Sequence, residues 1–204
     1  GWPSGTYGLP KPRSSCPPSF KYGYRYHDTE DKDPFNGWDT ALGGYFNRNN
    51  LRQDFCMKVS SSGSEHWPKG DYCIYKYGSC PPGFRSGSIY LDDEDNRNEN
   101  SKSGYVPDGD YGRNTRYDYC CRNDESRSTP MDLPTGGRFY LFPYSYPQCQ
   151  QVTGMTSRLE WIRFDTEDGF RSSQDESYVS GNHPYVVIRD YHRKDPKIYY
   201  CFYY

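Results

Sequence analysis

Eight cysteines spread over the whole length are the feature that most constrains how this chain folds. An even number of cysteines favours disulfide bonds formed in an oxidising, extracellular compartment. Zinc binding would predict a pair of close Cys-x-x-Cys motifs, and the sequence contains none. We expect all eight to be bridged, with the adjacent pair pointing to opposite sides of a strand and joining different partners. Which cysteine pairs with which stays open at this point. The cysteines are Cys16, Cys56, Cys73, Cys80, Cys120, Cys121, Cys149 and Cys201.

The second feature is an internal repeat. With one gap, "WPSGTYGLPKPRSSCPPSFKYGYRYHDTED" from Trp2 aligns with "WPKGDYCIYKYGSCPPGFRSGSIYLDDED" from Trp67. A third acidic stretch follows Phe164, and the Pro-x-Gly-x-Tyr motif recurs at 107–111 and, loosely, at 134–140. In every copy a cysteine follows the tyrosine by eight or nine residues. The irregular period indicates duplication inside a single domain, residues 1–204.

Composition favours a β fold with an aromatic core. The chain holds 23 Tyr, 10 Phe and 4 Trp, together with 20 Gly and 16 Pro. Aromatic residues favour strands, and Gly and Pro mark turns. We therefore predict an all-β domain with little helix, in a sandwich-like, barrel-like or trefoil-like arrangement. A turn or two of helix is expected only near "NNLRQDF", and the closing "IYYCFYY" is expected to be a buried or paired strand.

Charge and hydropathy exclude two classes of partner. The net charge is -2 with basic and acidic residues interleaved, so no basic stripe is available for nucleic-acid phosphates. No 18-residue apolar segment occurs, so we expect no membrane span.

Several segments together resemble the apextrin C-terminal (ApeC) domain. They are "GWPSGTYGLPKP", "WPKGDYCIYKYGSCPPGF", "IYLDDEDNRNEN", "PDGDYGRNTRYDYCCR", "LPTGGRFYLF", "CQQVTGM" and "YYCFYY". The likeness covers practically the whole chain and includes the eight-cysteine framework. It implies a secreted or mucosal protein of a marine invertebrate that recognises bacterial peptidoglycan and its muramyl dipeptide unit in innate immunity. The membrane-attack/perforin domain that some members carry is not in this sequence, so pore formation is not implied.

The acidic stretches offer oxygen ligands of the kind that calcium prefers. Asp92, Asp93 and Asp95 are our calcium candidates, although neither "DDEDNRNEN" nor "DTEDKDPFN" matches an EF-hand. The alternative is that the repeated Asp and Asn side chains cap backbone N–H groups of turns. Repetition at equivalent places after a strand favours a shared structural task.

No pattern of catalytic residues is evident. Two acids suffice for a glycosidase, but catalytic pairs seldom come in triplicate. The four histidines lack the spacing of a zinc protease, and no Gly-x-Ser-x-Gly elbow is present. We therefore predict a protein that is not an enzyme and has no cofactor other than calcium.

Aromatic rings that neighbour polar turns are the candidates for contact with a sugar, because sugars present apolar C–H faces that stack on such rings. Trp67, Tyr90 and Trp161 meet this description. A peptidoglycan stem also carries carboxylates, which Arg113 and Arg116 could bind in a bidentate manner.

Two functions follow from the sequence. The first is non-catalytic, extracellular binding of bacterial cell-wall glycan. The alternative is a structural or adhesive secreted protein that self-associates through its strands into filaments or mucus matrix.

Overall fold

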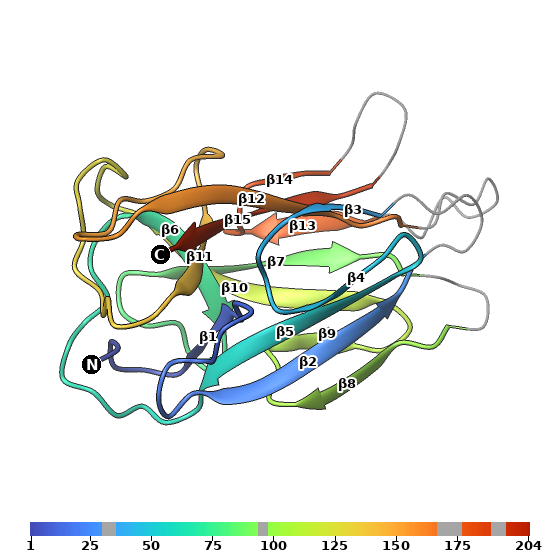
Figure 1. Cartoon of the computed structure of the whole chain (residues 1–204), viewed down its shortest axis with the longest axis horizontal. Coiled ribbons are helices and arrows are strands. Elements are labelled where there is room, and N and C mark those ends of the chain that lie inside the picture. The colour runs from blue at the N-terminus through green and yellow to red at the C-terminus, as the bar shows by residue number, and fades with distance from the viewer. Residues whose placement is uncertain (30–35, 94–97, 167–176, 189–194) are drawn as a thin grey trace.

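The computed structural model describes residues 1–29, 36–93, 98–166, 177–188 and 195–204. Within these ranges the chain forms one antiparallel β-sheet of fifteen strands that does not close into a barrel, and it contains no helix (Figure 1). The helix expected at "NNLRQDF" is therefore wrong. That segment lies in a strand, since Leu51 and Phe55 face the core while Arg52 and Asp54 form an ion pair on the other face. The described residues hold no helix long and apolar enough to span a membrane.

The strands fall into three successive groups of five, which we call units 1, 2 and 3. Unit 1 contains β1 (Tyr7–Pro10), β2 (Lys21–Asp28), β3 (Gly37–Asp39), β4 (Gly44–Phe46) and β5 (Asn50–Lys58). Unit 2 contains β6 (Asp71–Lys76), β7 (Arg85–Leu91), β8 (Ser101–Gly104), β9 (Gly109–Tyr111) and β10 (Thr115–Asn123). Unit 3 contains β11 (Phe139–Pro143), β12 (Ser157–Arg163), β13 (Tyr178–Gly181), β14 (Val186–Val187) and β15 (Lys197–Tyr203).

The three units share one pairing plan. In each, the fifth strand pairs with the first, second and fourth strands of the same unit. The third strand leaves its unit and pairs with a second strand elsewhere: β3 with β12, β8 with β2, and β13 with β7. Unit 1 therefore gives a strand to unit 3, unit 3 gives one to unit 2, and unit 2 gives one to unit 1, so the exchange is cyclic. The repeat found in the sequence is thus a three-fold pseudosymmetric fold.

Disulfide bonds follow the same plan. In each unit a cysteine between the first and second strands is bonded to a cysteine of the fifth strand. These bonds are Cys16–Cys56, Cys80–Cys120 and Cys149–Cys201. The fourth bond, Cys73–Cys121, joins β6 to β10 and has no counterpart in units 1 and 3. All eight cysteines are bridged and the adjacent pair has two different partners, as predicted.

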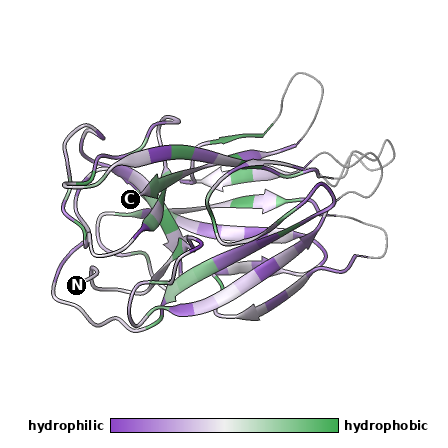
Figure 2. Cartoon of the chain, viewed as in Figure 1, coloured by the Kyte–Doolittle hydropathy of each residue, from purple (hydrophilic) through white to green (hydrophobic). Residues whose placement is uncertain are grey.

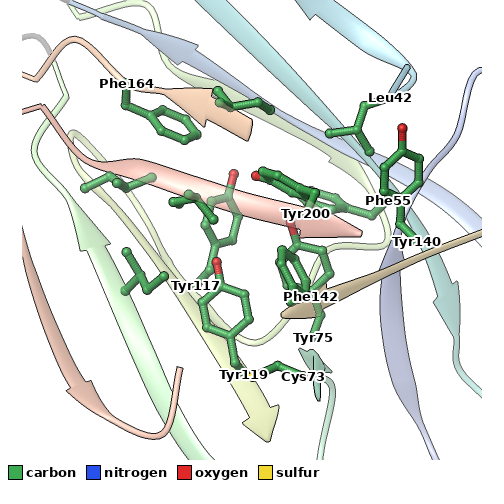
Figure 3. Close-up of a cluster of buried hydrophobic side chains, with 14 of the residues drawn as sticks. Leu42, Phe55, Cys73, Tyr75, Tyr117, Tyr119, Tyr140, Phe142, Phe164 and Tyr200 are labelled. Atoms are coloured by element: carbon green, nitrogen blue, oxygen red, sulfur yellow. The ribbon is translucent and has the colours of Figure 1, made fainter. Parts of the chain in front are cut away.

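The first strands of the units lie at the centre of the sheet, where β6 pairs with both β1 and β11. Two hydrophobic clusters cover their two faces. In the cluster drawn in Figure 3, Phe55 of unit 1, Tyr75 of unit 2 and Phe142 of unit 3 are in contact, since the Tyr75 ring packs against both of the others. Figure 2 shows the hydrophobic ribbon concentrated where β6, β11 and β15 meet, whereas β2 and β8 are pale or hydrophilic. Aromatic rings thus replace the aliphatic side chains that the sequence lacks.

The Pro-x-Gly-x-Tyr motif has a structural task. In three copies the tyrosine hydroxyl donates a hydrogen bond to the carbonyl of the motif's own proline, at 2.6 Å each time. The loose fourth copy differs, because Tyr140 donates to the Glu160 carboxylate instead. The copy at 107–111 does not open a unit: it forms β9 inside unit 2.

Candidate ligand-binding site

The acidic turns follow β2, β7 and β12, at the end of the molecule opposite the two chain termini (Figure 1). An aspartate stands at the equivalent position of each turn, and its backbone N–H is capped by a side chain that precedes the exchanged strand of another unit. The pairs are Asp28 with Asn100 Oδ1 at 2.6 Å, Asp92 with Ser177 Oγ at 3.0 Å, and Asp165 with Asn36 Oδ1 at 2.7 Å. These cyclic caps tie the units together, so the repeated acidic turns serve the fold.

The next residue of the unit 2 turn, Asp93, belongs to a buried polar network. Its carboxylate accepts hydrogen bonds from Thr115 Oγ1 at 2.7 Å and Asn100 Nδ2 at 2.8 Å. His27 Nδ1 lies 3.1 Å from the same carboxylate, and His27 Nε2 lies 2.7 Å from the Tyr117 hydroxyl. The network is enclosed, because His27 and Asp93 are almost completely buried. Asp93 is thus already engaged by protein groups.

Calcium binding at this end stays a prediction. Within the described ranges no group of three or more His, Cys, Asp or Glu side chains is arranged to hold a metal ion. Asp95, one of the three calcium candidates, lies outside the described residues. Asp92 and Asp93 are both buried beside the backbone caps.

The candidate aromatic residues do not gather into one site. Trp67 is only 4% exposed and packs edge-on against Tyr7, so its assignment to a ligand contact is corrected to a core position. Tyr90 stacks on the exposed Tyr178, with ring centroids 4.7 Å apart, on the outer face of unit 2. Trp161 lies on the outer face of unit 3, where the Lys197 ammonium group stands 4.2 Å from its ring centroid.

The two candidate arginines also differ in what they offer. Arg116 is already paired, since its guanidinium contacts Asp118 at 2.8 Å and Asp110 at 2.6 Å. Arg113 is exposed in the turn before β10, where its backbone carbonyl accepts hydrogen bonds from Asn98 and Asn100. Arg116 is the cross-strand partner of Tyr90, so the structure brings these two predicted residues together. Trp67 and Trp161 are not paired with either arginine.

A pocket that the sequence did not indicate lies at the opposite end, beside the N-terminus. Its volume is about 870 Å³ and its lining is mainly apolar. Trp2, Phe20 and two adjacent prolines, Pro17 and Pro18, provide the apolar surface. Serine hydroxyls, glycine backbone and one guanidinium group provide the polar part; these residues are Ser14, Ser15, Ser19, Ser60, Ser62, Gly63, Gly136, Gly137 and Arg138. A large, mostly apolar hollow with a few polar groups is the usual form of a small-molecule site.

Unit 1 departs from unit 2 beside the pocket. In unit 2, the Arg122 guanidinium lies 5.1 Å from the centroid of the Phe84 ring and covers it. The equivalent of Arg122 in unit 1 is Lys58, and the equivalent of Phe84 is Phe20. The Lys58 ammonium group turns away to the carbonyls of Gly5, Ser60 and Ser62 and leaves Phe20 facing the pocket. Burial lowers the pKa of Lys58.

Ser19, on the pocket wall, has an unusual backbone conformation. Its φ is +72°, and it is the one non-glycine residue with positive φ in the described part of the chain. The equivalent positions of units 2 and 3 are Gly83 and Gly154, with φ of +90° and +76°. Only glycine adopts such values without steric cost. Unit 1 therefore accepts strain in order to place a hydroxyl-bearing side chain at the pocket.

Arg138 is the exposed cationic side chain of the pocket, whose lining also includes Lys58, which is hydrogen-bonded to backbone carbonyls. Arg138 stands one residue before β11 and follows the two glycines of the wall. Its guanidinium forms no hydrogen bond or ion pair with another described residue. It is therefore available to bind a carboxylate of a ligand in a bidentate manner.

Comparison with known proteins identifies the family. The family model described as the C-terminal domain of apextrin (ApeC) matches residues 2–203. Comparison with curated proteins and with solved structures returned no match. The four disulfide bonds and the family are consistent with an extracellular protein. Because the match spans all but the two terminal residues, the chain belongs to the apextrin C-terminal domain family.

Proposed function

We propose that this chain is a non-catalytic extracellular protein that binds bacterial cell-wall glycan, namely peptidoglycan and its muramyl dipeptide unit, in innate defence. The observation that carries the proposal is the pocket of unit 1, which combines aromatic rings, hydroxyl groups and an arginine. Membership of the apextrin C-terminal domain family supports the same function.

The pocket's chemistry suits a muramyl ligand. Trp2 and Phe20 offer ring surfaces on which the C–H face of a sugar stacks. Arg138 offers two parallel N–H donors to the carboxylate of a lactyl or stem-peptide group. The serine hydroxyls act as donors or acceptors for sugar hydroxyls and amides. The volume of about 870 Å³ lies in the range of sites for ligands of this size.

The experiment is retention on insoluble peptidoglycan, competed with soluble muramyl dipeptide, for the wild type, Arg138→Gln and Arg113→Gln. We expect Arg138→Gln to weaken binding by roughly tenfold or more, because a charged bidentate pair is lost. Arg113→Gln, an exposed arginine at the other end of the molecule, is the matched control and should bind as the wild type does. Loss of binding in Arg113→Gln alone would place the carboxylate contact in the turn before β10.

Two further arms of the same assay test the remaining alternatives. Loss of retention in chelator would assign a calcium role to the acidic turns. If the wild-type protein is not retained on peptidoglycan in any condition, the proposal is wrong and the structural, self-associating alternative is favoured. Size-exclusion chromatography then separates the two functions, because a binder elutes near 23.9 kDa and an assembly elutes in the void volume.

A further inference from the structure

The outer face of unit 1 carries a row of tyrosines beside the pocket wall. Phe20 lines the pocket, and β2 starts at the next residue. Along β2, side chains alternate between faces: Arg25 and His27 are buried, whereas Tyr22, Tyr24 and Tyr26 lie on the other face. Tyr22 is 45% exposed, and its ring is 6.4 Å from that of Tyr24.

Strand pairing extends this surface sideways. Tyr24 pairs with Asp54 and Tyr26 pairs with Arg52 on β5, and Arg52 in turn pairs with Tyr45 on β4. Arg52 and Asp54 form a bidentate ion pair at 2.9 and 3.1 Å, and the Arg52 guanidinium lies 5.5 Å from the Tyr24 ring centroid. We call this surface the tyrosine face. Its members are Tyr22, Tyr24, Tyr26, Tyr45, Arg52 and Asp54.

A comparison of equivalent positions in the three units shows which residues of the tyrosine face the fold requires and which are specific to unit 1. By strand register, the positions of Tyr22 and Tyr24 are held by Ser86 and Ser88 in unit 2, and by Leu159 and Trp161 in unit 3. The Arg–Asp pair is present in unit 2 as well, so it belongs to the shared plan. The position of Tyr26 holds a tyrosine in unit 2 as well, Tyr90, so the tyrosines specific to unit 1 in this row are Tyr22 and Tyr24. Because serines occupy the same strand positions in unit 2, the sheet does not require aromatic rings there.

The chemistry of the tyrosine face suits one kind of occupant. Exposed rings on a strand present flat apolar surfaces at a regular spacing of about 7 Å. Between the rings, a carboxylate, a guanidinium and the Ser101 and Ser103 hydroxyl-bearing positions of β8 provide hydrogen-bonding groups. The one ion pair is neutral overall, and aliphatic side chains are absent from the set. This combination matches a sugar polymer, with apolar C–H faces and many hydroxyls, better than it matches an apolar protein segment.

We infer that the tyrosine face binds an extended β-1,4-linked hexosamine chain, alongside the pocket that holds a single muramyl unit. The inference rests on the proposed function for the identity of the polymer. It assigns the pocket to the carboxylate-bearing unit and the tyrosine face to the neutral backbone of the same chain. Contacts with several sugar rings at once would raise the affinity for the polymer above that for the short fragment.

The test uses two insoluble polymers, peptidoglycan and chitin. Chitin has β-1,4-linked N-acetylglucosamine but lacks the lactyl and peptide carboxylates. The variant Tyr22→Ser/Tyr24→Ser copies the residues of unit 2. We expect it to bind both polymers roughly tenfold more weakly than the wild type, since two stacking rings are lost. Tyr146→Ser removes an exposed tyrosine between β11 and β12 that lines neither the pocket nor the tyrosine face; it is the matched control and should bind as the wild type does. Arg138→Gln should lose affinity for peptidoglycan and keep its affinity for chitin.

The outcomes separate the inference from the proposed function. If the wild type binds a polymer and the double serine variant binds it equally well, the assignment of the tyrosine face as a binding surface is overturned. A wild-type protein that binds neither polymer would overturn both the proposed function and the tyrosine face. Binding to chitin that depends on the tyrosines, without binding to peptidoglycan, overturns the proposed function and supports the tyrosine face. Thermal unfolding of each variant checks that the fold is intact.

Discussion

At the acidic-turn end the three units repeat the same contacts, whereas at the pocket end unit 1 departs from units 2 and 3. The caps on Asp28, Asp92 and Asp165 follow one cyclic rule. By contrast, Ser19 stands where the other units have glycine, and Lys58 stands where unit 2 has the arginine that covers its phenylalanine. The caps that obey the pseudosymmetry tie the units together, whereas at the pocket end the residues that break it are the ones available for binding.

The largest effect should come from the buried network of the acidic-turn end. Asp93→Ala removes an acceptor shared by His27, Thr115 and Asn100. We expect it to lower the free energy of unfolding by about 3–5 kcal/mol, because buried partners lose their counterpart. Urea denaturation measures this. Asp110→Ala removes an exposed carboxylate and should cost less than about 1 kcal/mol. Equal losses in the two variants would contradict the account.

The caps should come next, with a loss of stability in all three units. Asn36→Ala, Asn100→Ala and Ser177→Ala each leave a backbone N–H without its acceptor. The expected cost is about 1–3 kcal/mol per variant. Denaturant midpoints compare them directly. An effect confined to one unit would show that the cyclic rule does not govern stability.

A smaller effect of opposite sign is expected at the pocket. Ser19→Gly relieves a left-handed backbone conformation and should raise the free energy of unfolding by about 1 kcal/mol. The reverse change, Gly83→Ser, should lower it, because the added side chain meets the Arg122 guanidinium. Thermal unfolding of the two variants side by side tests the sign. A destabilised Ser19→Gly would mean that the serine hydroxyl serves the fold.

The smallest effect on stability belongs to Arg138→Gln. The guanidinium is exposed and makes no ion pair with another described residue, so the free energy of unfolding should change by less than about 0.5 kcal/mol. Binding to peptidoglycan should nevertheless fall. Denaturation and retention measured on one preparation compare the two. A variant that loses stability and binding together would assign Arg138 to the fold.

Much of the fold was predictable because repeats and strands leave local signals. The alignment from Trp2 and Trp67 located units 1 and 2, and the acidic stretch after Phe164 located unit 3. The exchanged strands were not predictable. β8, for example, is Ser-Lys-Ser-Gly, fully exposed and without an alternating pattern, and its pairing with β2 depends on a distant part of the chain.

The site was less predictable, because identical motifs have different environments. Trp2 and Trp67 open the same repeat, yet Trp2 lines the pocket and Trp67 is buried. Arg122 donates a hydrogen bond to the Trp67 carbonyl in unit 2, whereas its equivalent in unit 1, Lys58, contacts other carbonyls. These two residues lie about 55 positions beyond each motif in the chain. One signal was available in the sequence: "CPPSF" in unit 1 has Ser19 at the position where "CPPGF" in unit 2 has Gly83.

The central claim is that the ligand contacts unit 1 where it breaks the pseudosymmetry. Hydrogen–deuterium exchange with and without soluble muramyl dipeptide tests it most directly. We expect slower exchange in residues 14–20, 58–63 and 134–138, with residues 89–93 and 163–166 of the acidic-turn end unchanged. Slower exchange confined to those acidic-turn segments would contradict it.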